Sequence, residues 1–186
     1  MTRFADQKHV DAFHDIGEYP RIHERITAAV RDHGGGRRAL DLGACTGLLA
    51  HRIAQWCPEV HALEPNAEYR SRGVTHPRVT WHEHGVTFDT LAWIGQLIAE
   101  RGIRLVVARR VFPEIGPAVT AAFADVAAVA GIERIILEGR IPSRRSTDPL
   151  PDADAEVQAL SATYTPIHAD AHVRVLHARN APEDHS

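Results

Sequence analysis

The chain has a carboxylate and a glycine turn at the end of one apolar run, and a second carboxylate at the end of the next. Asp41 is followed by Gly43 and Gly47, and Glu64 ends the run Val60–Leu63. Glu64 lies 23 residues after Asp41 (64 − 41), close to the roughly 20 residues that precede a ribose-binding carboxylate in nucleotide-binding folds. A carboxylate can accept hydrogen bonds from both ribose hydroxyls. The spacing therefore indicates a site for a nucleoside-containing cofactor.

Two better-known nucleotide-binding turns do not fit this stretch. The dinucleotide fingerprint G-x-G-x-x-G would need glycines at the positions that Cys45 and Leu48 occupy. The phosphate-binding P-loop would need Gly-Lys-Ser or Gly-Lys-Thr, which does not follow the turn. A nicotinamide-dependent reductase is therefore disfavoured.

The sequence Asp41-Leu42-Gly43-Ala44-Cys45-Thr46-Gly47 resembles the D/E-x-G-x-G-x-G motif of class I S-adenosylmethionine-dependent methyltransferases. Cys45 stands where that motif has its middle glycine. The sequence Leu63-Glu64-Pro65-Asn66 is similar to the second motif of the family. The resemblance covers residues 38–138 and implies a Rossmann-like fold, S-adenosylmethionine as cofactor and S-adenosylhomocysteine as product. Carboxylates suit this cofactor because it carries a sulfonium and an ammonium group.

The resemblance also implies roles for individual residues. The glycine turn would line the methionine and ribose portion, Asp41 would attract the ammonium group, and Glu64 would hold the ribose. Glu83, with Asp89 as the alternative, would accept a hydrogen bond from the adenine amine. Tyr19 or Arg21 would reach the cofactor carboxylate. The implied cofactor-binding set is Asp41, Gly43, Ala44, Cys45, Gly47, Glu64, Glu83 and Tyr19.

Positive charge follows the fourth and fifth apolar runs, where the methyl acceptor is expected. The arginines there are Arg109, Arg110, Arg140, Arg144 and Arg145. Guanidinium groups bind carboxylates and phosphates through a planar fork. One interpretation is that Arg109, Arg110, Arg144 and Arg145 bind an anionic acceptor, either a small molecule or a nucleic-acid backbone. The other is a set of solvated arginines in ordinary ion pairs. The fourth run lacks the Asp/Asn-Pro-Pro-Tyr/Phe motif of enzymes that methylate exocyclic amines.

The thirteen histidines raise the question of a metal site or a general base. His82 and His84 share one face of a strand end, and His168 lies near His172. Neither pair has a third ligand nearby in the sequence, and protein zinc sites need three or four, so we expect no metal. His82 and His84 are candidates for a general base because histidine titrates near neutral pH. No catalytic residue is assigned.

Apolar runs alternate with helical segments, which predicts βαβ units and a mostly parallel sheet. The predicted strands are Arg38–Leu42, Val60–Leu63, Val79–His82, Arg104–Ala108 and Arg134–Glu138. The predicted helices are Phe4–Ile16, Tyr19–His33, Leu48–Trp56, Ala67–Arg72, Phe88–Arg101, Pro117–Ala130 and Asp154–Ala162. Residues 163–179 alternate in polarity and predict a terminal hairpin with its turn near Asp170.

These elements predict one α/β domain over residues 1–186, a Rossmann-like three-layer sandwich around a seven-stranded sheet. Residues 1–36 would form N-terminal helices, residues 37–140 the cofactor-binding core, and residues 141–186 the C-terminal helix and antiparallel hairpin. A length of 186 residues suits one domain.

The composition narrows the class of protein further. The net charge of −3 argues against non-specific coating of nucleic acid. The N-terminal residues lack the apolar stretch of a signal peptide, and we read no apolar run near the ~20 residues that span a bilayer. We therefore expect a cytoplasmic methyltransferase. The alternative is a non-catalytic module that binds the same cofactor or its product, and the sequence leaves the acceptor and the oligomeric state open.

Overall fold

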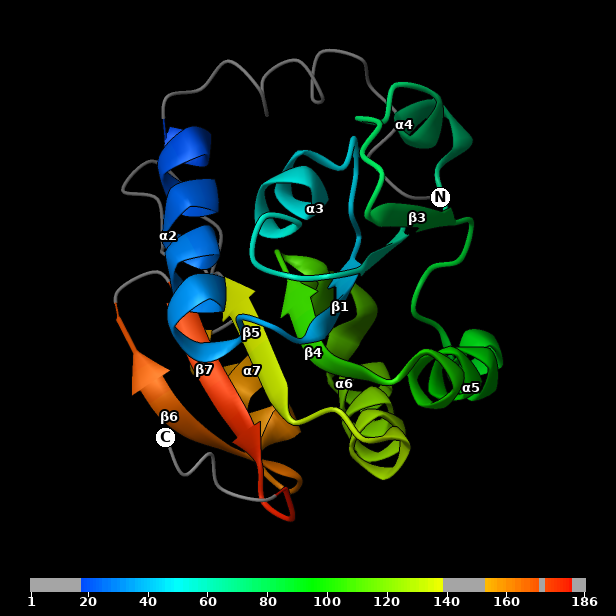
Figure 1. The fold of residues 1–186 in the computed structure, drawn as a ribbon. Coiled ribbons are helices and arrows are strands. Elements are labelled where there is room, and N and C mark those ends of the chain that lie inside the picture. Colours follow the sequence, from blue (N-terminus) through cyan, green and yellow to red (C-terminus); the bar gives the residue numbers. More distant parts are fainter. Residues whose placement is uncertain (1–17, 139–152, 171–172, 182–186) are drawn as a thin grey trace, which may run out of the picture.

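The computed structural model describes residues 18–138, 153–170 and 173–181. Seven strands form one sheet in the order β3-β2-β1-β4-β5-β7-β6 (Figure 1). The strands are β1 (Arg38–Leu42), β2 (Val60–Leu63), β3 (Val79–His82), β4 (Ile103–Ala108), β5 (Arg134–Glu138), β6 (Tyr164–Ala169) and β7 (Val173–Ala178). The first five pair in parallel, and β7 pairs antiparallel with both β5 and β6. The predicted sheet with its C-terminal antiparallel hairpin is confirmed.

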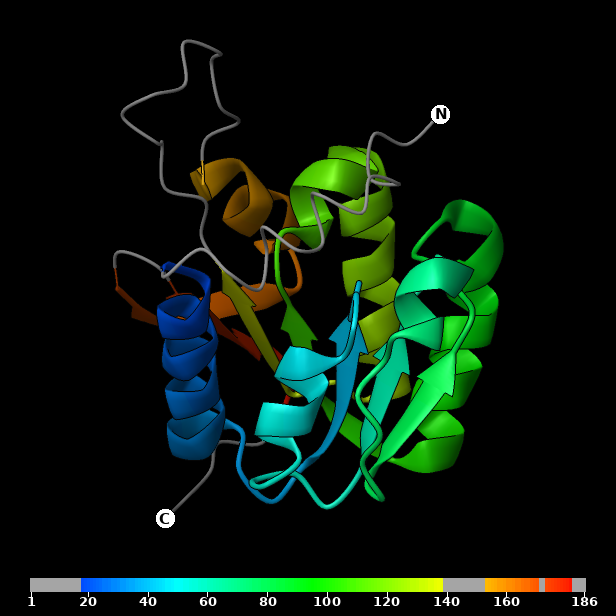
Figure 2. The same cartoon turned by 90° about the horizontal axis from the view of Figure 1, so that it is seen from above.

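Helices cover both faces of the sheet and make it the middle of three layers (Figure 2). The helices are α2 (Glu18–His33), α3 (Leu48–Ile53), α4 (Ala67–Ser71), α5 (Leu91–Arg101), α6 (Val111–Ala130) and α7 (Ala153–Leu160), with a 3₁₀ turn η1 at Phe88–Thr90. On one face, α2 and α3 bury Ile26, Val30 and Ile53 against the sheet. On the other face, α5, α6 and α7 bury a larger cluster that includes Phe112 and Phe123.

The parallel strands are joined by crossover connections that leave from their carboxyl ends. The residues that follow these strands therefore lie along one edge of the sheet. The strands β1, β2, β4 and β5 are in direct register, with Asp41 opposite Ala62 on one side and Val107 on the other. Residues just after these strands therefore meet at one edge, where ligands bind in open α/β sheets. That edge positions the candidate site.

Four of the five predicted parallel strands have the predicted bounds, and β4 begins one residue earlier at Ile103. The predicted helix 88–101 is split, because η1 precedes α5. A 3₁₀ turn has three residues per turn, so Phe88 is out of register with the buried side of α5 and is 61% exposed. Ala92 is exposed too, and the buried face contains Ile94 and Leu97. Phe88 and Ala92, two apolar residues of the predicted helix, therefore lie outside its buried face.

Helix α6 begins six residues earlier than the predicted start at Pro117. Gly116 has a non-helical backbone (φ 79°, ψ 166°) that breaks the helix just before Pro117, where proline is tolerated as a first helical residue. The shorter α3 ends at Ile53 rather than Trp56. The predicted helix 4–16 lies outside the described residues.

Helix α6 is also, within the described ranges, the one helix long and apolar enough to cross a membrane by length and composition alone. Helices in protein cores meet the same criteria, and α6 places Phe112, Phe123 and Ala127 in the larger core cluster. Of the apolar window of α6, 28% is buried inside the structure. The cytoplasmic location stays a prediction.

Candidate functional site

The turn after β1 has a left-handed backbone at three alternate positions. Gly43 (φ 64°), Cys45 (φ 52°) and Gly47 (φ 72°) all lie in the region that favours glycine. The main-chain N–H of Ala44 donates to the carbonyl of Leu63 at 2.9 Å, and that of Gly47 donates to the carbonyl of Ala44 at 2.7 Å. The turn is thus closed on itself and tied to β2.

Both glycines are also needed for space. A Cβ at Gly43 would lie 2.7 Å from a methyl group of Val111, and one at Gly47 would lie 2.5 Å from the indole of Trp81. The sequence suggested that these glycines admit a ligand. At Gly47 the close neighbour is a side chain of the protein itself, contributed by β3.

Glu64 lies beside this turn and is 6% exposed. Its Oε2 accepts a 2.9 Å hydrogen bond from the main-chain N–H of Cys45, and its Oε1 accepts a 2.8 Å hydrogen bond from that of Asn66. Burial raises the pKa of Glu64, while these two N–H donors oppose the rise. Each carboxylate oxygen has a second lone-pair site, so the group can still accept hydrogen bonds from a ligand.

Asp41 lies on β1 below the turn and is 1% exposed. Burial and the nearby charge of Glu64 raise the pKa of Asp41 to about 8, although Arg109 opposes the rise. Its Oδ2 accepts no hydrogen bond from the described residues. The structure therefore brings two buried carboxyl groups together at the tips of β1 and β2, as the spacing of Asp41 and Glu64 had suggested.

The arginines after β4 have partners within the chain. Arg109 donates to Oε2 of Glu138 at 2.9 Å, and its Nη1 lies 2.8 Å from Nε2 of His23. Nε of Arg110 lies 3.7 Å from Oε1 of the same carboxylate. Glu138 ends β5 and is buried. The predicted Arg144 and Arg145 lie outside the described residues, so the four predicted acceptor arginines are not brought together here.

His82 is held by a second histidine that the sequence did not single out. Nε2 of His82 lies 2.9 Å from Nδ1 of His61, and Nε2 of His61 lies 3.0 Å from a carboxylate oxygen of Glu59. Burial, with the neighbouring charges of His61 and His84, lowers the pKa of His82 to about 4. A neutral histidine with this pKa is a weak base. His84 stacks on Trp93 with ring centroids 4.0 Å apart.

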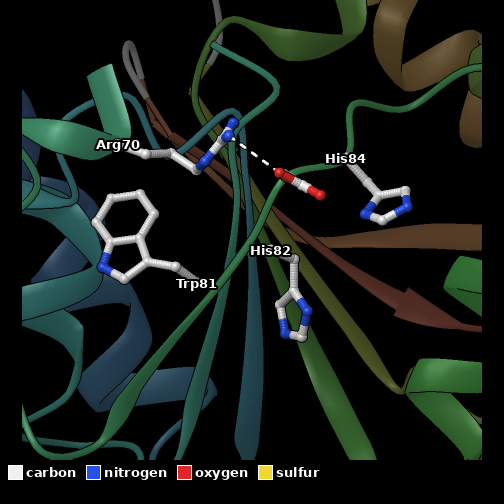
Figure 3. Close-up of a pocket in the computed structure, with 5 residues that line it drawn as sticks. Arg70, Trp81, His82 and His84 are labelled. Atoms are coloured by element: carbon white, nitrogen blue, oxygen red, sulfur yellow. Dashed lines mark hydrogen bonds and ion pairs between the residues drawn. The ribbon is translucent and has the colours of Figure 1, made fainter. Parts of the chain in front are cut away.

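Glu83 lies at the rim of a pocket of about 330 Å³ at the end of β3, lined by Arg70, Trp81, His82, Glu83 and His84 (Figure 3). Arg70 donates to Oε2 of Glu83 at 3.3 Å. Asp89, the alternative to Glu83 for the adenine contact, lies in η1. Tyr19 belongs to the first turn of α2, and the position of its side chain is not among the described features.

Four residues that sequence analysis missed help to build the site: Arg70, Trp81, His61 and Glu138. Of these four residues, only Glu138 could have been recognised from the sequence. It lies at the end of a predicted parallel strand, and Glu64 lies directly after one. Among the described residues, no three His, Cys, Asp or Glu side chains gather in a way that could hold a metal ion. The expectation of no metal stays a prediction.

No family model and no curated protein matches this sequence. Solved structures do match. The N-methyltransferase NodS from Bradyrhizobium japonicum, in complex with S-adenosylhomocysteine, is 11% identical with a TM-score of 0.70 over 94% of each chain. The magnesium protoporphyrin IX methyltransferase ChlM from Synechocystis, with bound S-adenosylmethionine, is 14% identical with a TM-score of 0.61 over 96% of this chain and 84% of that one. The chain therefore has the Rossmann-like fold of class I S-adenosylmethionine-dependent methyltransferases.

A third structure, a methyltransferase-like protein from Anabaena variabilis, is 20% identical with a TM-score of 0.53 over 77% of this chain and 60% of that one. At these identities the likeness establishes the fold, and the chemistry must be argued from the residues.

Proposed function

We propose that this protein is an S-adenosylmethionine-dependent methyltransferase. The observation that carries the proposal is the contact between the glycine turn and the carboxylate of Glu64, with Asp41 buried beside them. Two carboxyl groups in a buried site favour a cationic ligand over a pyrophosphate. The sulfonium of S-adenosylmethionine supplies the methyl group that an acceptor takes up.

The chain's own residues have distinct roles in this proposal. Glu64 holds the ribose hydroxyls, and its two main-chain donors fix the carboxylate so that little reorganisation is needed on binding. Asp41, which keeps a proton up to a pKa of about 8 in the free protein, would lose it when the ammonium group binds and would then pair with that charge. The left-handed turn brings the backbone of residues 43–47 close to the cofactor. Together these groups orient the cofactor, which is the protein's main contribution to chemistry of this kind.

The acceptor would approach the ends of β4 and β5, where Arg109, Arg110 and Glu138 lie. Arg109 is engaged in a buried ion pair, which favours a structural role for its guanidinium. Arg110, whose side chain is 38% exposed, is the better candidate for contact with an anionic small molecule or nucleic-acid backbone. His82 has a pKa of about 4 and a histidine partner, which makes it a poor candidate for a base.

Calorimetric titration with S-adenosylhomocysteine, followed by transfer of a labelled methyl group to fractions of a cell extract, tests the proposal. We expect micromolar binding, loss of affinity in Glu64→Ala, and label in at least one fraction. Binding without transfer would favour the non-catalytic module. Absence of binding, with the protein folded by circular dichroism, would overturn the cofactor assignment.

A further inference from the structure

Arg70 connects the ends of two neighbouring strands. Its Nη1 donates to the main-chain carbonyl of Glu64 at 2.6 Å. Its Nη2 donates to Oε2 of Glu83 at 3.3 Å, the contact drawn as a dashed line in Figure 3. Glu64 follows β2, and Glu83 follows β3. One side chain therefore ties the main chain of Glu64, the residue proposed for the ribose, to the carboxylate of Glu83, proposed for the adenine.

The position of Arg70 is itself fixed by the local chain. Asn66 begins α4, and its side-chain oxygen accepts from the main-chain N–H groups of Glu68 (2.9 Å) and Tyr69 (3.4 Å). Tyr69 is buried. The cap starts this short helix two residues after Glu64, and from within the helix Arg70 reaches back to the carbonyl of Glu64.

A guanidinium group presents its donors in a rigid plane. When Nη1 is held by the carbonyl of Glu64, the direction of Nη2 is set as well, and the carboxylate of Glu83 is placed relative to Glu64. Glu83 is otherwise exposed, with 75% of its side chain accessible. An isolated surface ion pair orders its partners weakly, but here one end of the pair is anchored to a buried strand tip.

The contact with Arg70 uses Oε2 and leaves Oε1 of Glu83 to accept a further hydrogen bond. The exocyclic amine of adenine donates a hydrogen bond, whereas the corresponding oxygen of hypoxanthine is an acceptor that a carboxylate repels. We infer that Arg70 is a positioning residue that determines the base selectivity of the cofactor site, by holding Glu83 so that it accepts from adenine and rejects hypoxanthine. This inference rests on the proposed function.

The test compares the affinities of S-adenosylhomocysteine and S-inosylhomocysteine by calorimetry. The proteins are wild type, Arg70→Lys, Glu83→Gln and the control Arg78→Lys. Arg78 donates to the carbonyl of Ala54 at 3.0 Å, at the opposite end of β3. Lysine keeps the charge of Arg70 but has a single nitrogen, which cannot reproduce the two-pronged contact.

We expect wild type and Arg78→Lys to prefer the adenine ligand by roughly tenfold, the effect of one good hydrogen bond. In Arg70→Lys and Glu83→Gln the preference should fall to about twofold or less, with the thermal midpoint measured alongside. A general loss of folding would weaken both ligands together and leave the ratio unchanged.

Two results would overturn the inference: equal affinity of wild type for both ligands, or a wild-type ratio retained in Arg70→Lys while Glu83→Gln loses it. In both cases the proposed function stands, because S-adenosylhomocysteine still binds. Failure of wild type to bind either ligand would instead remove the proposed function.

Discussion

The main-chain N–H of Cys45 and the carboxylate of Glu64 form a 2.9 Å hydrogen bond that joins the turn after β1 to the tip of β2. The donor belongs to a residue with a left-handed backbone, and the acceptor is buried. The geometry of the turn therefore depends on the carboxylate of Glu64, and changes to either residue should affect the cofactor site.

Glu64→Gln should weaken binding of S-adenosylhomocysteine by about 1–3 kcal/mol, the usual effect of a lost buried hydrogen bond. The amide keeps the shape of the side chain but turns one acceptor into a donor that faces a main-chain N–H. Calorimetric titration measures the change. Glu68→Gln, on the exposed side of α4, is the matched control and should bind as wild type does. Equal affinities of the two variants would contradict the assignment of the ribose contact.

Cys45 and Gly47 should respond to substitution with opposite signs. A left-handed backbone disfavours a non-glycine residue by about 1–2 kcal/mol, so Cys45→Gly should raise the free energy of unfolding by up to about 1 kcal/mol after glycine's extra chain entropy. Gly47→Ala adds the same strain and brings a methyl group into the indole of Trp81. It should lower the free energy of unfolding by roughly 2 kcal/mol or more.

Urea denaturation of both variants measures these changes. Destabilisation by Cys45→Gly beyond about 1 kcal/mol would mean that the thiol makes a contact worth more than the backbone strain.

Asp41 makes stability depend on pH in a defined direction. Burial raises the pKa of Asp41 from 3.8 to about 8, so between these values the folded state keeps a proton that the unfolded state has lost. The free energy of unfolding therefore falls as pH rises through this window. Asp41→Asn should remove this slope and be more stable than wild type at pH 8, by on the order of a few kcal/mol.

The measurement is urea denaturation at several values of pH from 4 to 9. Above pH 8, where the carboxyl group of Asp41 is ionised, the same variant should bind S-adenosylhomocysteine more weakly, because an amide does not attract an ammonium group. Parallel stability curves for wild type and Asp41→Asn would show that the carboxyl group is ionised without penalty.

His82 should remain neutral over the whole physiological range. Its pKa is lowered to about 4, below the value of 6.5 expected in the unfolded chain. The unfolded state therefore binds more protons between these values, and the free energy of unfolding falls as pH drops through the window. NMR titration of the imidazole C–H signals, assigned with His82→Gln, should show no transition for His82 above pH 5. A midpoint near 6.5 would restore His82 as a candidate base.

The strands and strand ends that carry the site could be predicted from the sequence, whereas most of its side-chain contacts could not. The alternation of apolar runs placed Asp41 and Glu64 at adjacent strand tips, because parallel strands end at one edge. It could not predict that Trp81 fills the space over Gly47, because that contact depends on the register of β2 with β3 (Leu63 opposite His82) and on the path of the chain between them. The register of β3, an edge strand of the sheet, is set by its packing against the neighbouring elements, which no local pattern records.

The arginines illustrate the same limit. Arg109 was expected at the acceptor cleft because it follows the fourth predicted strand, where ligands meet an open parallel sheet. In the structure it is largely buried, where Glu138 provides the opposite charge from a strand 29 residues away in the sequence. Arg109 and Glu138, at the ends of β4 and β5, therefore form one buried ion pair.

The ion pair of Arg109 and Glu138 allows a structural role of Arg109 to be distinguished from a role in binding the acceptor. Removal of one partner of a buried ion pair leaves an uncompensated charge and typically lowers the free energy of unfolding by about 3–5 kcal/mol. We expect losses of this size in Arg109→Met and in Glu138→Leu, and a loss in the double variant well below their sum, because no charge is then left buried. Urea denaturation of the four proteins forms a double-mutant cycle.

Arg110→Gln completes the comparison. Because its side chain is partly exposed and its distance to Glu138 is longer, at 3.7 Å, the substitution should lower the free energy of unfolding by less than about 1 kcal/mol. If Arg110 contacts an anionic acceptor, the same variant should raise KM for that acceptor without a matching change in the affinity for S-adenosylhomocysteine. Additive losses for Arg109→Met and Glu138→Leu would show instead that the two groups do not stabilise each other, and Arg109 would then regain its place as a candidate for binding the acceptor.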